Sequence, residues 1–435
     1  AIPLIMGNVF QQLYNTVDSI VVGNYLGTSA LAAVGATTAI CNTLVNFFNG
    51  ISIGAGVVIS TSFGAKNLEK LHEAVETTIL FAVIVGCFVS LISIGVVPVM
   101  LKWMSTPDDV VGPAGEYLKI YFVGVPVLFL YNMGSAILRA VGDTRRPLLF
   151  LIISSCLNIV LDILFVAVFH WGISGVAIAT VISQMISCVL VLRCLCRSES
   201  SYRLRFSELG MKGYYLKQIF SVGVPAGIQS TVINFSNVLL QSSVNSFGST
   251  AMAGYTAANN LLGFLYVSVN SITQACMSFT SQNYGVGKLK RMDRVLADCM
   301  ILSVVVAVVL GCICYGFGPE ILQIYTEDAE VIACGMEILA YTTITYFLCG
   351  WMDLFPGALR GMGYSAVPMV LSVIGTVGTR VVWIFGIFPY HRSLAILFIS
   401  YPASWIITIV LQVICFYFVR RRVHRRSQAL AGQEA

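Results

Sequence analysis

The stretch LRAVG at residues 138–142, which Pro147 follows, has a counterpart in LRGMG at residues 359–363, which Pro368 follows. The two stretches lie 221 residues apart. One constant offset that recurs in separate motifs indicates an internal duplication, so the two halves of the chain should share one fold. The same offset relates two further pairs of segments: 63–68 with 284–289, and 27–30 with 248–251.

The composition places both copies in a membrane. The chain has 435 residues, of which 57% are hydrophobic and 10% charged, and its mean hydropathy is +0.85. Soluble domains contain about 25% charged residues, so this is an all-α polytopic membrane protein. Apolar runs long enough to cross a bilayer predict twelve transmembrane helices, near residues 3–26, 33–60, 75–101, 117–138, 147–169, 172–195, 217–246, 254–281, 295–318, 333–359, 366–388 and 394–418.

The duplication divides these helices into two six-helix bundles. Because six is an even number, both copies have the same topology and form parallel repeats. We predict an N-terminal lobe at 1–195, a cytoplasmic linker at 196–216, a C-terminal lobe at 217–419 and a basic tail at 420–435.

Basic residues indicate the orientation. If the N-terminus is cytoplasmic, 21 of the 25 Lys and Arg residues fall on the inner side, as the positive-inside rule requires. We therefore expect a multi-pass protein of the cytoplasmic membrane with both termini in the cytoplasm. The chain starts at Ala1-Ile2-Pro3 without an initiator methionine, so we expect further cytoplasmic residues before it.

Several functional classes fit the sequence poorly. The net charge of +5 is explained by topology signals, and no nucleic-acid-binding motif accompanies it, so we expect no nucleic-acid partner. The 13 cysteines lack zinc-site spacing and are expected to be small buried residues. The four histidines lie near predicted interfaces and no catalytic motif is present, so we expect neither an enzyme nor a cofactor.

Few ionisable residues lie deep in the predicted spans, and such residues mark functional sites. Asp18 shares a polar stripe with Gln11 and Asn15, and Asp162 lies one helical turn after Asn158. Asp18, Asp162 and Thr180 each lie roughly 12 Å below the outer surface, at 1.5 Å per residue. The alternative is that Asn158 and Asp162 only hydrogen-bond between helices. We predict a site for H⁺ or Na⁺ formed by Asp18, Asn158, Asp162 and Thr180.

The second copy lacks these carboxylates. Asp18 corresponds to a leucine, and Asn158 and Asp162 correspond to Thr379 and Trp383. An uncharged stripe of Asn234, Asn237, Gln241 and Asn245 remains, which either binds a ligand or faces the central cavity. Arg380 either faces the cleft and balances an acid or binds backbone carbonyls. For Asp353 we expect a local ion pair with Arg360.

The whole chain resembles the multidrug and toxic compound extrusion (MATE) transporters. The opening from Pro3 to Asp18, with QLYN at residues 12–15, and the two LR(A/G)xG elements carry the resemblance. It implies two bundles that form a V-shaped cleft, and export of organic, often cationic, compounds in exchange for H⁺ or Na⁺. The expected partners are small organic molecules and membrane lipid, without an obligate protein partner.

Within that family the first-lobe set resembles the DinF-like branch, in which the first helix bends near the residue that matches Pro3. A rival function in the same superfamily, a lipid-linked oligosaccharide flippase, would need a basic cleft, and only Arg380 is a deep cation here. A promiscuous cleft suits aromatic and amide side chains. The candidate cleft residues are Gln11, Tyr14, Asn15, Phe47, Asn234, Asn237, Gln241, Asn259, Gln274 and Arg380.

Overall fold

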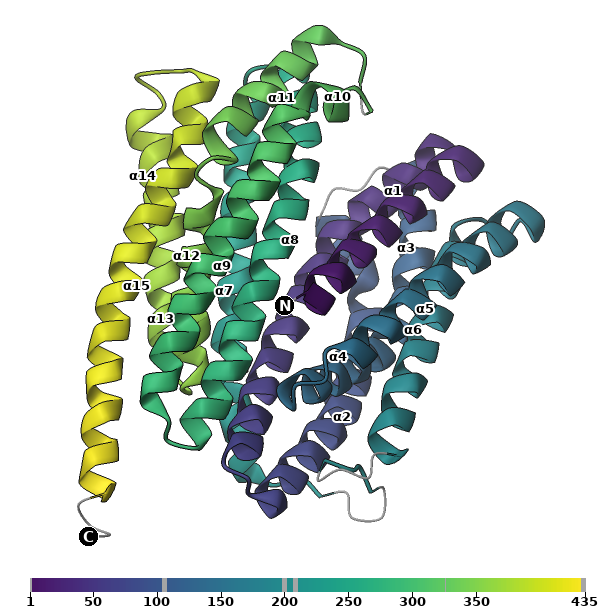
Figure 1. Cartoon of the computed structure of the whole chain (residues 1–435). Coiled ribbons are helices and arrows are strands. Elements are labelled where there is room, and N and C mark those ends of the chain that lie inside the picture. The colour runs from purple at the N-terminus through teal and green to yellow at the C-terminus, as the bar shows by residue number, and fades with distance from the viewer. Residues whose placement is uncertain (1, 104–107, 198–201, 206–209, 325, 432–435) are drawn as a thin grey trace. The chain divides into compact units, whose positions relative to one another are not determined.

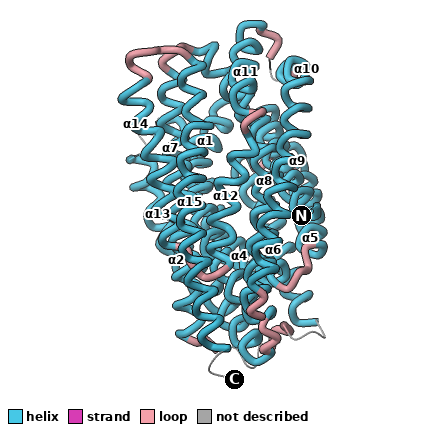
Figure 2. Tube along the Cα trace, turned by 60° about the vertical axis from the view of Figure 1, so that its left-hand side comes forward, coloured by secondary structure: helices cyan, strands magenta, loops and turns pink. Residues whose placement is uncertain are grey.

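The computed structural model describes residues 2–103, 108–197, 202–205, 210–324 and 326–431. Side chains are described over the same ranges except at positions 2, 8, 9, 12–36, 38–40, 103, 108–110 and 426–431. The described residues form helices and their connections, with no strand (Figure 2). The all-α prediction is therefore confirmed.

The chain divides into two compact units, Ile2–Phe220 and Ser221–Ala435. The first unit contains α1 (Ile2–Gly64), α2 (Leu68–Trp103), α3 (Asp108–Val123), α4 (Val125–Ala140), α5 (Arg145–Asp162), the π-helical segment η1 (Ile163–Val168) and α6 (Gly172–Arg197). Helix α7 (Gly213–Asn245) begins in the first unit and continues into the second. The second unit then contains α8 (Ser249–Gly285), α9 (Leu289–Gly316), α10 (Gly318–Gln323), α11 (Ala329–Thr342), α12 (Tyr346–Gly361), α13 (Ala366–Ser372), η3 (Val373–Gly378), α14 (Thr379–Val382), η4 (Trp383–Ile387) and α15 (Leu394–Ala431).

The backbone repeats with the offset that the sequence predicts. Helices α4 and α12 differ by 221 residues at both ends, and each follows a preceding helix at a sharp bend, of 46° and 50° respectively. The turns repeat as well: Gly142 and Gly363 have φ of 93° and 86°, a region that glycine enters without steric cost. The duplication therefore extends to individual backbone irregularities.

Each predicted span lies on helical backbone, but several boundaries were wrong. The first two spans share the single helix α1, which stays helical through the predicted break at 27–32. A straight helix of that length would be about 95 Å long, and Figure 1 shows that the path of α1 instead turns back on itself. Residues 27–32 contain no proline that would end the helix there.

The spans predicted at 117–138 and 333–359 are each broken rather than continuous. In the first, α4 starts after Gly124, with Pro126 in its first turn, where the missing N–H of proline is tolerated. The second break has no proline. There the hydroxyl groups of Thr343 and Thr345 donate to the carbonyls of Leu339 and Tyr341, at 2.5 and 2.9 Å, and such back-bonding bends helices.

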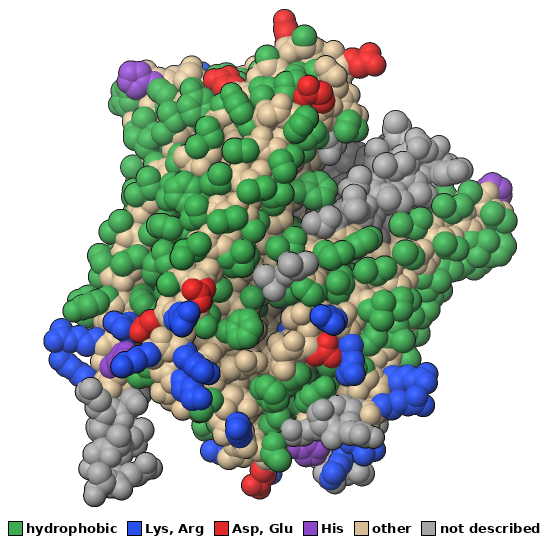
Figure 3. Space-filling view, in the orientation of Figure 1, with side chains coloured by type: hydrophobic (Ala, Val, Ile, Leu, Met, Phe, Trp, Pro, Cys, Tyr) green, Lys and Arg blue, Asp and Glu red, His purple; other side chains and the backbone are tan. Residues whose placement is uncertain are grey.

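Length and hydropathy support membrane crossing. In the described part of the chain, seven helices can span a membrane, or nine if each bent pair counts as one span. Helices α7 and α8 are not among them, since they carry the amide and hydroxyl side chains discussed below. In Figure 3 hydrophobic side chains cover the sides of the units, and Lys and Arg gather at one end of each.

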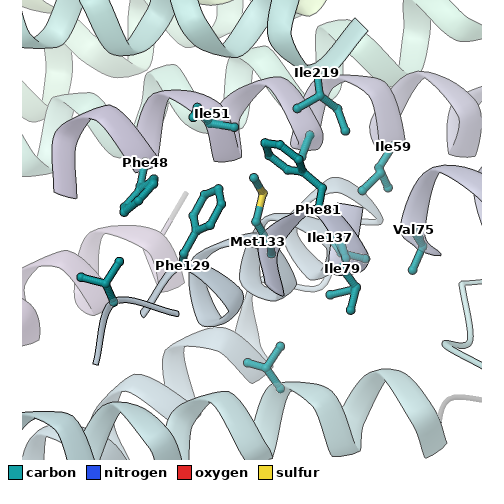
Figure 4. Packing of buried hydrophobic residues seen from close by; sticks show 14 of the residues in the cluster. Phe48, Ile51, Ile59, Val75, Ile79, Phe81, Phe129, Met133, Ile137 and Ile219 are labelled. Carbon is teal, nitrogen blue, oxygen red and sulfur yellow. The ribbon is translucent and has the colours of Figure 1, made fainter. Parts of the chain in front are cut away.

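Each unit has its own packed interior. In the first, Phe48 stacks on Phe129 with ring centroids 4.3 Å apart, and Phe81 meets Phe129 edge-on at 5.9 Å (Figure 4). In the second, Tyr346 and Trp405 pack edge-to-face at 5.6 Å. Since lipid is as apolar as these side chains, such van der Waals packing holds membrane helices together. This packing holds the helices that carry the candidate sites in place.

Candidate functional site

The polar face of α5 is the central feature of the first unit. Ser154, Asn158 and Asp162 follow one another at four-residue intervals and share one face of the helix. All three are buried, and Asn158 and Asp162 have exposed fractions of 1% and 0%. A carboxylate removed from water in this way needs hydrogen bonds, a proton or a nearby cation to be stable.

Helix α6 supplies the opposite wall of this site. The Ser154 hydroxyl donates to the carbonyl of Ser183 at 3.0 Å, which sets the register between α5 and α6. Because antiparallel helices have the same rise per residue, Asn158 then lies level with Ala179 and Thr180. Thr180 is buried, and its hydroxyl donates to the Val176 carbonyl at 3.0 Å. Asn158, Asp162 and Thr180 are therefore all buried on two neighbouring helices, with Thr180 at the level of Asn158, and their joint ion binding stays a prediction.

The backbone changes its geometry directly after Asp162. Residues Ile163–Val168 form the π-helical segment η1, and π-helical turns occur frequently at functional sites. Gly175 on α6 lies against this segment, because a Cβ there would come within 3.1 Å of the Phe165 Cβ. Asp162 is thus held at the junction between regular and widened helix.

The remaining first-unit candidates are only partly described. Pro3 is half-buried, and a Cβ at Gly7, one turn later, would lie 3.4 and 3.6 Å from the side chains of Leu148 and Leu151 on α5. The helical turn after the predicted bending point therefore packs on the helix that carries Asp162. Gln11 and Phe47 are exposed. The side chains of Tyr14, Asn15 and Asp18 lie outside the described residues, so the place of Asp18 in the site stays a prediction.

Arg380 occupies a site that fits neither prediction made for it. Its side chain is buried, with 3% exposed. Nη1 donates to the Ser236 hydroxyl at 2.9 Å and to Asn237 Oδ1 at 2.7 Å, and the Tyr401 ring covers the guanidinium with its centroid 4.7 Å from Cζ. Arg380 thus binds side-chain oxygens and a ring, and neither an acid nor a backbone carbonyl among the described residues.

Other amides of the second unit pair locally. Gln241 donates to Asn245 at 3.4 Å, and Gln274 donates to Asn270 at 3.0 Å. Asn234 and Asn259 are exposed. Asn237 therefore differs from the other described amides of the predicted stripe in its hydrogen-bond partner, because it accepts a bond from Arg380.

The predicted ion pair between Asp353 and Arg360 was wrong. Arg360 instead donates to Gln229 Oε1 on α7 at 2.6 Å, and no Asp353–Arg360 pair lies within 4.0 Å in the described part of the chain. The two residues are seven positions apart on α12 and remain electrostatic neighbours, while the guanidinium binds Gln229 on α7 directly.

Sequence reasoning missed four polar residues of these sites. Ser154 and Ser183 set the helix register, and a signal for Ser154 was present, because it precedes Asn158 by one turn. Ser236 lies beside the predicted Asn237, but no sequence pattern indicates that it faces Arg380. Tyr401 gave no signal, since an aromatic residue in a span is ordinarily a packing residue.

Comparisons with known proteins agree with the repeat and the fold. The model of the MatE family matches residues 3–164 and 225–385, once in each copy. The probable multidrug resistance protein YoeA of Bacillus subtilis is 30% identical over 432 residues, which cover 97% of this chain and 93% of that protein.

Two solved structures show the same fold. A crystal structure of MATE in the bent conformation has a TM-score of 0.87 and 21% identity, over 99% of this chain and 95% of that one. A crystal structure of MATE in the straight conformation has a TM-score of 0.87 and 21% identity, over 98% and 94%. The chain therefore belongs to the MatE family of multi-pass membrane transporters and is not an enzyme.

Proposed function

We propose that this protein is a secondary active multidrug antiporter of the cytoplasmic membrane, with both termini in the cytoplasm. It exports small organic, often cationic, compounds in exchange for H⁺ or Na⁺. The relative from Bacillus subtilis, which is named a probable multidrug resistance protein, supports drug efflux. The rival lipid-linked oligosaccharide flippase has no comparable support, because Arg380 is the only deep cation that the sequence predicts.

The observation that carries ion coupling is the burial of Asp162. A carboxylate with no exposed surface, one helical turn after Asn158, is neutralised by a proton or by a cation that oxygen atoms coordinate. Reversible occupation of such a site changes the charge inside the bundle, and that change can bias a conformational equilibrium. We assign the coupling ion to Asp18, Asn158, Asp162 and Thr180, as in the DinF-like branch.

A bend of α1 near Pro3 would connect ion binding to helix movement. The first turns of α1 pack on α5 through Gly7, so occupation of the site at Asp162 and the position of α1 affect the same helix. Structures of MATE proteins exist in a bent and in a straight conformation. We extend that difference to this chain as part of the proposal.

Transport in proteoliposomes tests the proposal. The full chain is reconstituted, a fluorescent organic cation is loaded, and an inward pH or Na⁺ gradient is imposed separately. We expect one of the two gradients to drive efflux of the cation. We expect Asp162→Asn and Asp18→Asn to fold and to lose this gradient-driven efflux. Asp298→Asn is the matched control, because the Asp298 side chain is 68% exposed.

The outcomes separate the alternatives. Efflux that neither gradient drives, or that persists unchanged in both Asn variants, would contradict the coupling assignment. Flipping of a labelled lipid-linked oligosaccharide in the same vesicles, without efflux of the cation, would favour the rival function.

A further inference from the structure

The charge of Arg380 is not balanced by a carboxylate. Among the described residues no acidic side chain lies within 4.0 Å of its guanidinium. Its ionisable neighbours are Tyr401, Tyr255, Tyr346 and Cys349, side chains that ordinarily carry no charge at neutral pH. A buried cation compensated only by neutral dipoles is costly. The guanidinium therefore has no carboxylate in direct contact among the described residues, and the acid that shares its neighbours, Asp353 on α12, interacts with Cys349 and Tyr346 instead.

The surroundings of the Arg380 guanidinium contain more hydrogen-bond donors than acceptors. Both bonds that the guanidinium donates to described residues come from Nη1, and the buried Nε has no acceptor. The hydroxyl groups of Tyr255 and Tyr401 lie 3.2 Å apart and share one hydrogen bond. One of these two hydroxyl protons is therefore left for a further acceptor. An anion would satisfy both the charge and the donors.

The guanidinium is also fixed in orientation. Ser236 and Asn237 hold Nη1, while the Tyr401 ring covers one face of the plane at 4.7 Å. The opposite edge, formed by Nε and Nη2, is the edge that binds carboxylate groups through two parallel bonds. Because this edge is held in place before a ligand arrives, little entropy is lost on binding.

We propose that Arg380, with the Tyr255–Tyr401 pair beside it, forms a binding site for one monovalent anion. The anion is either a halide ion or the carboxylate group of an organic compound, because both supply one negative charge to the Nε–Nη2 edge. The site lies within the second unit. It does not depend on the cation site of the first unit, so it can be tested without transport.

Thermal unfolding of the purified full chain tests the site. Sodium concentration and ionic strength are held constant while the bulky sulfonate isethionate is replaced by chloride, bromide, acetate or benzoate. We expect a saturating rise in Tm of roughly 2 to 4 °C in the wild-type protein. A response to the halides alone identifies an inorganic ion, and a response to the carboxylates alone identifies an organic acid group.

Variants connect the response to the guanidinium. Arg380→Gln should abolish the rise in Tm. Arg380→Lys, which keeps the charge without the forked edge, should retain part of the halide response and lose the carboxylate response. Arg392→Gln is the matched control, since Arg392 is an exposed arginine of the same unit, and should respond as the wild type does.

A second measurement keeps the test decisive if Arg380→Gln fails to fold. Bromide bound to the wild-type protein is located by its anomalous scattering, and we expect a peak within hydrogen-bond distance of Nε or Nη2 if the anion is a halide. Equal Tm in all five anions, an undiminished response in Arg380→Gln, or a halide response without bromide at Arg380 would each overturn the proposal.

Discussion

Helix α5 with η1 in the first unit and the run from α13 to η4 in the second are counterparts in the repeat, yet they carry opposite charges. Both become π-helical near the equivalent positions Asp162 and Trp383. On α5 the buried charged residue is Asp162, and on α14 it is Arg380, which corresponds to Ile159. The duplicated backbone was kept while the chemistry diverged.

This difference separates what the fold requires from what function requires. The bends, the glycine turns and the π-helical segments η1 and η4 recur in both copies, so packing alone can account for them. Asp162 and Arg380 have no charged counterpart at the equivalent positions, and a buried charge does not improve stability over an apolar residue of similar size. Fold stability alone therefore does not account for either charge, and the two proposals above assign them to ligands of opposite charge.

The largest effect is expected at Asp162. Asp162→Asn keeps the shape of the side chain and removes its charge, so gradient-driven efflux in proteoliposomes should fall to background while the Tm changes little. Trp383→Phe at the equivalent position should leave ion coupling in place. Coupled efflux in Asp162→Asn would mean that the two copies do not differ in the way proposed.

The next effect concerns Gly375 and its counterpart Ser154. A Cβ at Gly375 would lie 2.5 Å from Thr408 Oγ1 and 2.8 Å from Thr408 Cα, so Gly375→Ala should destabilise the protein by about 2 kcal/mol or more. Ser154→Ala loses only its bond to the Ser183 carbonyl, about 1 kcal/mol. Thermal unfolding of both variants compares them. Equal losses would show that the two helix pairs are packed equally closely.

A smaller effect is expected at the bend before α4. Since α12 follows a bend of 50° without proline at the position that corresponds to Pro126, Pro126→Ala should keep the bend of 46° and change the unfolding free energy by no more than about 1 kcal/mol. A structure of the variant measures the angle. A straight α3–α4 helix would assign that bend to the proline ring.

The smallest effects are expected at two ion pairs. Arg420 binds Asp293 through Nε and Nη2, each at 2.7 Å, and Lys212 Nζ lies 3.3 Å from Glu73. Exposed pairs contribute about 0.2 to 1 kcal/mol, so Asp293→Asn should lower stability by an amount in this range at low salt. Glu73→Gln should lower the stability by less, because the distance between Lys212 and Glu73 is longer and the pair is not bidentate.

High salt should reduce the Asp293→Asn effect by screening, and a loss that is independent of salt would point to packing instead. Glu73 has a second partner, the Tyr215 hydroxyl at 3.2 Å. Burial, followed by this hydrogen bond, raises the pKa of Tyr215 to about 12. The hydroxyl therefore stays protonated, and can donate to Glu73, throughout the neutral pH range.

Much of the fold could be predicted because the lengths of the apolar runs and the 221-residue offset between the two copies can be read directly from the sequence. The break at Thr343–Thr345 could not, since threonines in a span ordinarily remain helical and the bend depends on where their hydroxyl groups point. The helical path of α1 through residues 27–32 was missed because the spans were divided by the length of apolar runs alone, and span length does not say whether the backbone between two spans stays helical.

The site was predicted as far as helix periodicity reaches. Asn158 and Asp162 share a face because they are four residues apart, and Thr180 was placed by depth alone. The partners of Arg380 lie 144, 143 and 21 residues away along the chain. Contacts at such separations depend on how helices pack, which periodicity within one helix does not specify.

The bend at Thr343 and Thr345 has a further consequence. The Leu339 carbonyl accepts the backbone N–H of Thr343 at 2.9 Å as well as its hydroxyl, so the hydroxyl can rotate away without leaving that carbonyl unpaired. We therefore expect the angle of the α11–α12 pass to vary within the lifetime of the folded protein.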